Sequence, residues 1–126
     1  MTGRHAFRAA VEVRDHAAML ACFREDAVLH SPVSFQPFEG REAIARLFAI
    51  LLEVFHDFRY TDQLEAADGT LGLVFRARVD HRDVQGIDLV RFDPDGRIVD
   101  FTVMVRPRSA LEALFQAVAS RLAPKA

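Results

Sequence analysis

The chain has 126 residues, of which 51% are hydrophobic, and its formal net charge is −2. This length suits one domain, and the composition is that of a globular protein with a packed core, which excludes a disordered chain. The near balance of acidic and basic residues does not suggest nucleic acid or an anionic membrane as a partner. A single cysteine, Cys22, excludes an internal disulfide bond, and its place in a helical run suggests a small core residue.

The sequence shows no targeting or membrane-spanning segment. The first eight residues contain no apolar signal core. The longest apolar run, residues 47–55, is interrupted by Glu53 and is too short to cross a bilayer. We therefore expect a cytoplasmic protein whose residues 1–126 form a single domain.

Helical spacing dominates the first half of the chain. Apolar residues recur every three or four positions over residues 6–20 and again over residues 41–55, which predicts two amphipathic helical segments. Asp15 is a candidate cap that divides the first segment into two helices. Between the helical segments, residues 27–31 predict a short strand that Pro32 ends.

Strand spacing follows from residue 58 onward. Residues 58–66, 71–81, 84–92 and 98–105 predict four strands that follow one another as a meander. Two of the connections are typical turn sequences, Asp68-Gly69 and the segment 93–96. After Pro107, apolar residues at helical spacing predict a last helix that reaches Leu122.

This order of elements predicts an α+β fold. A cone-shaped, curved antiparallel sheet would be covered on one face by three to four helices. The mouth of such a half-open cone is a natural place for a small-molecule pocket.

One carboxylate, Asp88, interrupts an otherwise apolar strand. Side chains alternate along a strand, so Asp88 shares a face with Val90 and Phe92. If that face is the interior, desolvation raises the pKa of the carboxyl group, which then suits proton abstraction next to a carbonyl. If Asp88 faces outwards instead, it pairs with one of three arginines: Arg78, Arg91 or Arg106.

Three other side chains are candidates for chemistry. His30, near the end of the first strand, is either a base or hydrogen-bonding group for a ligand oxygen, or a polar strand end. Tyr60, the only tyrosine, is either a donor to an oxyanion or a packing residue with its hydroxyl at a rim. His81 is either a pocket residue, because it shares a face with Phe75, or an exposed turn residue.

The expected pocket lining is apolar, with one histidine. It consists of Phe38, Leu51, Phe55, Val90, Phe92 and His81. The alternative for the phenylalanines is a completely filled core. The five histidines show no metal-ligand spacing, and the chain has neither a glycine-rich phosphate loop nor a nucleophile-elbow serine. No metal or cofactor is therefore expected.

Several segments together resemble the nuclear transport factor two-like fold and, within it, the SnoaL-like group. They are Asp15, residues 23–32, residues 38–44, residues 86–98 and the exit into the last helix at residues 105–111. The resemblance spans nearly the whole chain. It implies a pocket between the helices and the concave sheet face, and homodimers formed through the outer sheet face. If Asp88 points inwards, three apolar residues lie on that outer face: Val74, Ile87 and Leu89.

Two enzyme patterns within this superfamily can be compared with the sequence. Ketosteroid isomerases pair a tyrosine on the first helix with two acids in the cavity, whereas the first helix here has Phe7. Enzymes similar to limonene-epoxide hydrolase use Arg-x-Asp on a middle strand and a second aspartate on the last strand. Arg78-Val79-Asp80 matches the first part, but residues 103–106 contain no acid.

Two functions therefore remain open. The first is a cofactor-free isomerase or polyketide-cyclase-type enzyme that acts on an apolar, carbonyl-bearing molecule. In that case Asp88 is the base and His30 or Tyr60 the hydrogen-bond donor. The second is a non-catalytic, dimeric module that binds a small apolar molecule. An epoxide-hydrolase-like activity fits the sequence less well.

Overall fold

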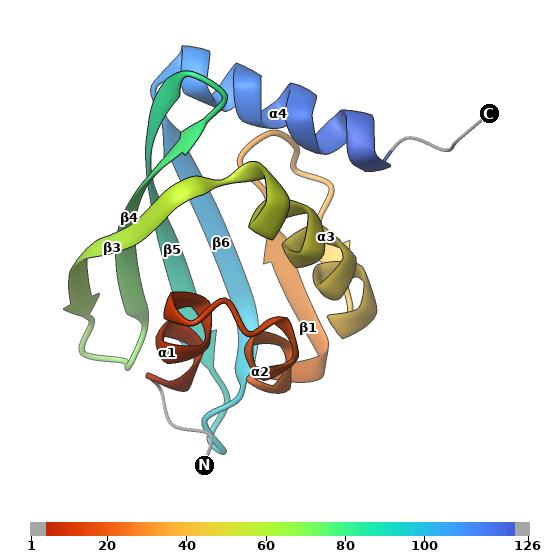
Figure 1. The fold of residues 1–126 in the computed structure, drawn as a ribbon. Coiled ribbons are helices and arrows are strands. Elements are labelled where there is room, and N and C mark those ends of the chain that lie inside the picture. Colours follow the sequence, from red (N-terminus) through yellow and green to blue (C-terminus); the bar gives the residue numbers. More distant parts are fainter. Residues whose placement is uncertain (1–4, 123–126) are drawn as a thin grey trace.

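The computed structural model describes residues 5–122. These residues form four helices and six strands (Figure 1). In order they are α1 (Ala6–Glu12), α2 (His16–Ala21), β1 (Phe23–His30), β2 (Phe38–Glu39), α3 (Arg41–Val54), β3 (His56–Glu65), β4 (Leu71–Val79), β5 (Arg82–Phe92), β6 (Ile98–Arg106) and α4 (Arg108–Leu122).

The six strands form one curved, unclosed sheet in the order β2-β1-β6-β5-β4-β3. Strands β1 and β6 run parallel to each other, and all other neighbouring strands are antiparallel. The sheet bends around the helices, with α4 across one end of its concave side and α1 and α2 near the other (Figure 1). The predicted α+β architecture with a curved sheet is confirmed.

Several element boundaries differ from the expectation, and β3 and β5 each begin two residues earlier than predicted. Strand β1 begins at Phe23, earlier than the predicted strand, and β2 is a short strand that the sequence pattern did not indicate. Strand β4 ends at Val79, because Asp80 has a positive φ of 53° and turns the chain towards β5. His81 therefore lies in a turn and has left the strand.

The predicted helix cap and turn sequences form the expected local structure. The Oδ1 atom of Asp15 accepts a hydrogen bond of 3.0 Å from the backbone N–H of Ala18, which satisfies a free donor at the start of α2. In the β5–β6 turn, the N–H of Asp93 donates to the carbonyl of Arg97 at 2.8 Å. Gly96 supplies the positive φ of 84° that this turn requires.

Aromatic rings fill the interior near α1 and α2. Four phenylalanines from different elements contact one another, with ring centroids between 5.2 and 5.9 Å apart. They are Phe7, Phe23, Phe48 and Phe101. Cys22 is buried beside them, as its sequence context predicted. No helix within residues 5–122 has the length and hydropathy needed to span a membrane.

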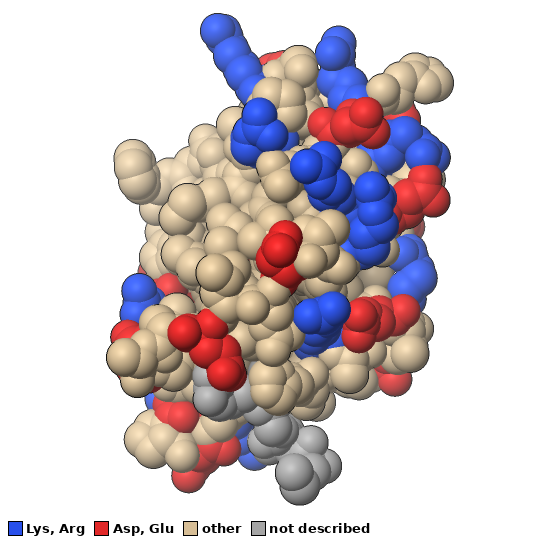
Figure 2. All heavy atoms as spheres, turned by 90° about the vertical axis from the view of Figure 1, so that its left-hand side faces the viewer, with Lys and Arg blue, Asp and Glu red and all other residues tan. Residues whose placement is uncertain are grey.

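The outer face of the sheet is partly apolar. Val74, Ile87 and Leu89 point to this face and are half-buried, and Met104 is 50% exposed. Seen from the side that carries β3 and β4, a broad area of the surface has few charged side chains, and most charged groups gather along its edges (Figure 2). Apolar side chains that are partly exposed on a sheet face, as these four are, are typical of a protein contact.

Candidate functional site

A cavity of about 500 Å³ lies between the helices and the concave face of the sheet. All four helices and all six strands of the described residues contribute to its wall, as does the loop that follows β1. Most of the lining side chains are aromatic or aliphatic. The wall of the cavity is therefore predominantly apolar.

Few polar side chains line the cavity. Asp88 and Tyr60 come from the sheet, whereas Glu12 and Arg14 come from the end of α1 and the turn after it. The loop after β1 adds three more: Ser31, Ser34 and Gln36. Arg14 is the one cationic side chain in the cavity wall among residues 5–122. It donates a hydrogen bond to the backbone carbonyl of Leu52, so its guanidinium already has an acceptor.

Asp88 points into the cavity from β5. It is 6% exposed, and within residues 5–122 it is the only polar or charged residue that is buried. Its neighbours on the same strand face, Gly86 and Val90, are also buried. Burial disfavours the carboxylate and raises the pKa of Asp88 to about 8. At neutral pH, Asp88 is therefore mainly a neutral carboxylic acid.

Tyr60 is the polar neighbour of Asp88. It lies on β3, where its ring meets that of Phe58 edge to face with centroids 5.1 Å apart. Its hydroxyl interacts with the Asp88 carboxyl as a hydrogen-bond partner, which lowers the pKa of Asp88 against the larger effect of burial. Burial, and then the charge of Asp88, raise the pKa of Tyr60 well above its ordinary value.

The protonation state of this pair decides what it offers to a ligand. When Asp88 is neutral, the pair holds two acidic protons, and a hydrogen bond between the two groups uses only one of them. The second proton is then available to a ligand oxygen. When Asp88 is ionised, Tyr60 donates to the carboxylate, and the remaining carboxylate lone pairs accept a proton. The site thus changes from a donor to a base near the pKa of about 8.

Three of the expected lining residues, Phe38, Leu51 and Phe55, line the cavity. Val90 and Phe92 do not. Val90 faces inwards but lies in the core with the four phenylalanines, and Phe92 packs against the same core near the end of β5. Side-chain parity predicts the face of a strand, but not whether a side chain reaches the cavity or is covered by others.

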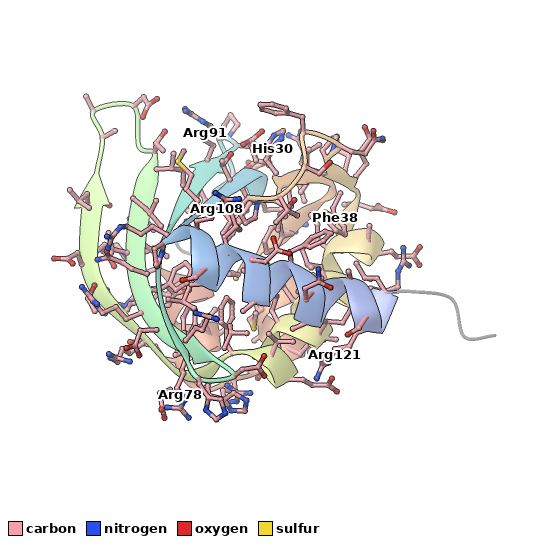
Figure 3. The ribbon with its side chains drawn as sticks, turned by 90° about the horizontal axis from the view of Figure 1, so that it is seen from above. His30, Phe38, Arg78, Arg91, Arg108 and Arg121 are labelled. Atoms are coloured by element: carbon pink, nitrogen blue, oxygen red, sulfur yellow. The ribbon has the colours of Figure 1, made fainter. Side chains whose placement is uncertain are left out.

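Neither histidine reaches the cavity. His81 is exposed in the β4–β5 turn, which agrees with the second interpretation of this residue, an exposed turn position. His30 lies on the outer side of β1, because Ala27 and Leu29 occupy the inner face of that strand. In Figure 3, His30 lies at the edge of the molecule, close to the loop that follows it.

His30 lines a neighbouring surface groove, which shares the loop after β1 and Val103 with the wall of the cavity. Its Nε2 atom lies 3.1 Å from Oδ2 of Asp100 on β6, and the groove also includes Thr102 and Met104. Asp88 lines the cavity and His30 lines the neighbouring groove, so the structure does not bring these two candidate residues together. Of the two candidate donors for Asp88, only Tyr60 lies beside it.

The epoxide-hydrolase pattern does not form a site. Arg78 is exposed at the edge of the molecule opposite His30 (Figure 3) and pairs with Asp57. Asp80 is exposed in a turn, and neither residue lines the cavity. Phe7 occupies the first helix and packs among the other phenylalanines, so the structure has no tyrosine there to meet the ketosteroid isomerase pattern.

Gly86 shapes the cavity, although the sequence reasoning gave it no role there. A Cβ atom at this position would lie 2.3 Å from Cζ of Phe75 and 2.8 Å from the carbonyl oxygen of Met104. The absence of a side chain therefore lets the Phe75 ring, which lines the cavity, lie directly over β5. A glycine inside a strand is a sequence signal for such a close approach.

Within residues 5–122, no three side chains of His, Cys, Asp or Glu are grouped as ligands for a metal ion. The titratable groups of the cavity are instead Asp88 and Tyr60 in its interior, with Glu12 and Arg14 from the α1 end. The chemistry that this arrangement supports is proton exchange and hydrogen bonding with an apolar molecule that carries an oxygen.

Comparisons with known proteins agree with this fold. The chain is 43% identical to a steroid delta-isomerase from Pseudomonas aeruginosa over 92% of this chain and 85% of that one, with a TM-score of 0.88. An uncharacterised protein with a cystatin-like fold from Silicibacter pomeroyi is 28% identical over 94% and 86% of the two chains, with a TM-score of 0.85.

A more distant structure shares the fold alone. It is SalBIII, an epoxide hydrolase/cyclase-like enzyme of pyran ring formation in the polyether salinomycin, with 21% identity over 84% and 88% of the two chains and a TM-score of 0.68. No protein with a curated description matches the chain. The sequence profile of the SnoaL-like domain matches residues 4–101. The chain therefore belongs to the SnoaL-like family.

Proposed function

We propose that the protein is a cofactor-free acid/base enzyme that moves a proton next to the carbonyl group of a small apolar molecule, as an isomerase or a cyclase does. The observation that carries this proposal is one buried carboxyl group, Asp88, with a pKa of about 8 at the wall of an apolar cavity of about 500 Å³. A group whose pKa lies near the working pH is suited to both taking and returning a proton. The similarity to a protein described as a steroid delta-isomerase supports the same class of reaction.

In the proposed reaction, ionised Asp88 removes a proton from the carbon next to the carbonyl, and the C–H electrons move to the oxygen to give an enolate. Where a C=C double bond is conjugated with the enolate, Asp88 returns the proton to the far carbon of that double bond, so the double bond moves next to the carbonyl, the carboxylate is restored and no cofactor is consumed. Tyr60 loses its charged acceptor when Asp88 becomes protonated, and its hydroxyl is then able to stabilise the enolate oxygen.

The wall favours a neutral ligand. Arg14 is the one cationic side chain in the described part of the wall, and its guanidinium is bonded to the Leu52 carbonyl. An anionic ligand group placed beside Asp88 would therefore be desolvated without a counter-charge. The proposed substrate class is a neutral ketone with a large apolar body.

Proton abstraction can be tested before the natural substrate is known. The purified protein is incubated in D₂O with small cyclic ketones, such as 2-tetralone, and deuterium uptake at the carbon next to the carbonyl is followed by mass spectrometry. We expect uptake above the uncatalysed rate for the wild-type protein and a loss of that excess for Asp88→Asn. Native mass spectrometry of the purified protein identifies any co-purified small molecule, which is then added to the ketone set.

The Asp88→Asn variant keeps the volume and most of the polarity of the side chain, so it separates proton transfer from packing. Arg78→Met changes an exposed residue at the molecular edge and is the matched control. Full exchange activity in Asp88→Asn would exclude Asp88 as the base.

A non-catalytic binding module is the second candidate, and one observation favours it. The other acids and bases expected from the sequence, His30 and His81, lie outside the cavity, so Asp88 and Tyr60 must supply both the base and the donor. A pure binding site would use neutral Asp88 as a hydrogen-bond donor. Ligand affinity would then fall above pH 8 in the absence of any deuterium uptake.

We also propose that the outer sheet face forms a homodimer. The half-buried apolar side chains on this face, Val74, Ile87 and Leu89, would be covered by a second copy of the sheet. Ile87→Arg is expected to convert a dimer into a monomer in light scattering, whereas Val13→Arg, at an exposed position after α1, is expected to leave the dimer intact. A wild-type monomer would contradict the proposal.

A further inference from the structure

The contacts of Arg8 on α1 link this helix to Tyr60, the partner of Asp88. The Cζ atom of Arg8 lies 5.4 Å from the centroid of the Tyr60 ring. Its Nη1 atom donates to Oε1 of Gln63 at 2.9 Å, and its Nε atom donates to Oε2 of Glu12 at 3.4 Å. Arg8 is therefore held by α1 and β3 at once, with its guanidinium against the aromatic ring.

Tyr60 is held from two directions. Phe58 meets its ring edge to face at 5.1 Å and 90°, and Arg8 contacts the ring as a cation. The hydroxyl of a tyrosine lies on the long axis of its ring, so fixing the ring also fixes the direction of the hydroxyl. Tyr60 and Asp88 both line the cavity, and Tyr60 is the one described side chain whose hydrogen bonding acts on the pKa of Asp88.

From these contacts we infer that Arg8 is a positioning residue of the site: it clamps the Tyr60 ring from α1 and thereby holds the Tyr60 hydroxyl against Asp88. This inference rests on the proposed role of Asp88 in proton transfer. Arg8 itself does not line the cavity, so it acts only through Tyr60.

The charged groups around Tyr60 and Asp88 agree with an effect of Arg8 that passes through Tyr60. Arg8, Glu12 and Asp88 are the charged groups that act on Tyr60, and the positive charge of Arg8 lowers the pKa of the Tyr60 hydroxyl. The pKa of Asp88 depends on burial and on the hydrogen bond of Tyr60, and Arg8 has no direct effect on it. An effect of Arg8 on Asp88 must therefore pass through the hydroxyl of Tyr60.

The experiment is an NMR titration of the Asp88 side-chain carbon in the ligand-free, full-length protein between pH 6 and 9.5. In Arg8→Met, which keeps an apolar chain over the ring but removes the charge and the fork of donors, we expect the Asp88 midpoint to move to higher pH. In Gln63→Leu, which leaves Arg8 in place but removes its anchor on β3, we expect a smaller shift in the same direction.

The deciding comparison is a double-mutant cycle with Tyr60→Phe. Once the hydroxyl is gone, Arg8→Met should produce no further shift of the Asp88 midpoint. Arg91→Met is the matched control, because Arg91 lies on β5 near Asp88 in sequence but is exposed and bonded to Thr70. It should leave the midpoint unchanged.

An unchanged Asp88 midpoint in Arg8→Met would overturn the inference. So would an equal shift with and without the Tyr60 hydroxyl, or an equal shift in Arg91→Met. The titration uses no substrate, so its result is separate from that of the deuterium-uptake assay that tests the reaction. If both proposals hold, the pH profile of deuterium uptake in Arg8→Met moves upwards together with the Asp88 midpoint.

Discussion

Replacing Asp88 by asparagine should stabilise the protein, and the gain should grow with pH. The carboxyl group ionises near pH 3.8 in the unfolded chain but at about 8 in the folded protein. The folded protein therefore retains a proton that the unfolded chain loses over this interval. Stability from this group is complete below the unfolded pKa and is lost as the pH rises to the folded pKa.

The size of this loss of stability follows from the difference between the pKa values of Asp88 in the unfolded and the folded protein. Each pH unit between the two pKa values lowers the free energy of unfolding by about 1.4 kcal/mol for one group. Across the whole interval, from 3.8 to about 8, the loss is on the order of 6 kcal/mol, which is a large share of the stability of a domain of this size. Asparagine does not ionise, so this loss is absent from Asp88→Asn.

The assay is urea denaturation of both proteins at fixed protein concentration and at half-unit steps from pH 5 to 9. The difference in free energy of unfolding, variant minus wild type, should rise steadily up to about pH 8 and then level off. Two curves that stay parallel across this range would show that Asp88 ionises normally in the folded protein, and the account of the site would be wrong.

Three further substitutions test other parts of the structure. Tyr60→Phe removes the hydrogen bond that favours the carboxylate, so the pKa of Asp88 should rise above its value of about 8, as an NMR titration would detect; a fall would contradict the assigned role of the hydroxyl. Gly86→Ala places a Cβ atom 2.3 Å from the Phe75 ring and should lower the free energy of unfolding by about 1–3 kcal/mol. Gly72→Ala is its control on β4, since the nearest atom there is 3.5 Å away, and equal losses in urea denaturation would refute the clash. Asp15→Ala removes the cap of α2 and should cost about 1 kcal/mol in thermal denaturation, and no change would mean that the cap bond is not formed in solution.

Much of the fold followed from local patterns in the sequence. The capping side chain of Asp15 and the turn at residues 93–96 form because they satisfy backbone groups within a few residues of themselves. Alternation along β5 placed Asp88 on the same face as Val90, and both are buried. Patterns of this kind depend on the period of one element and little on the rest of the molecule.

The candidate site depended on contacts between distant segments, which the sequence alone did not determine. Parity put His30 on one face of β1, but the buried face of that strand is the one with Ala27 and Leu29. His81 does not lie on the inner face of the sheet, because the positive φ of Asp80 turns the chain before it. The pairing of Tyr60 with Asp88 arises only when β3, β4 and β5 lie side by side in the sheet.

The central claim is that Asp88 exchanges a proton with an apolar ketone inside the cavity. Its most direct test is the pH profile of deuterium uptake by such a ketone with the wild-type protein and with Asp88→Asn. The account predicts that the wild-type rate rises to a plateau with a midpoint near the Asp88 pKa of about 8, and that the variant shows only the uncatalysed rate. A variant that exchanges as fast as the wild type, or a wild-type profile with no change near pH 8, would contradict it.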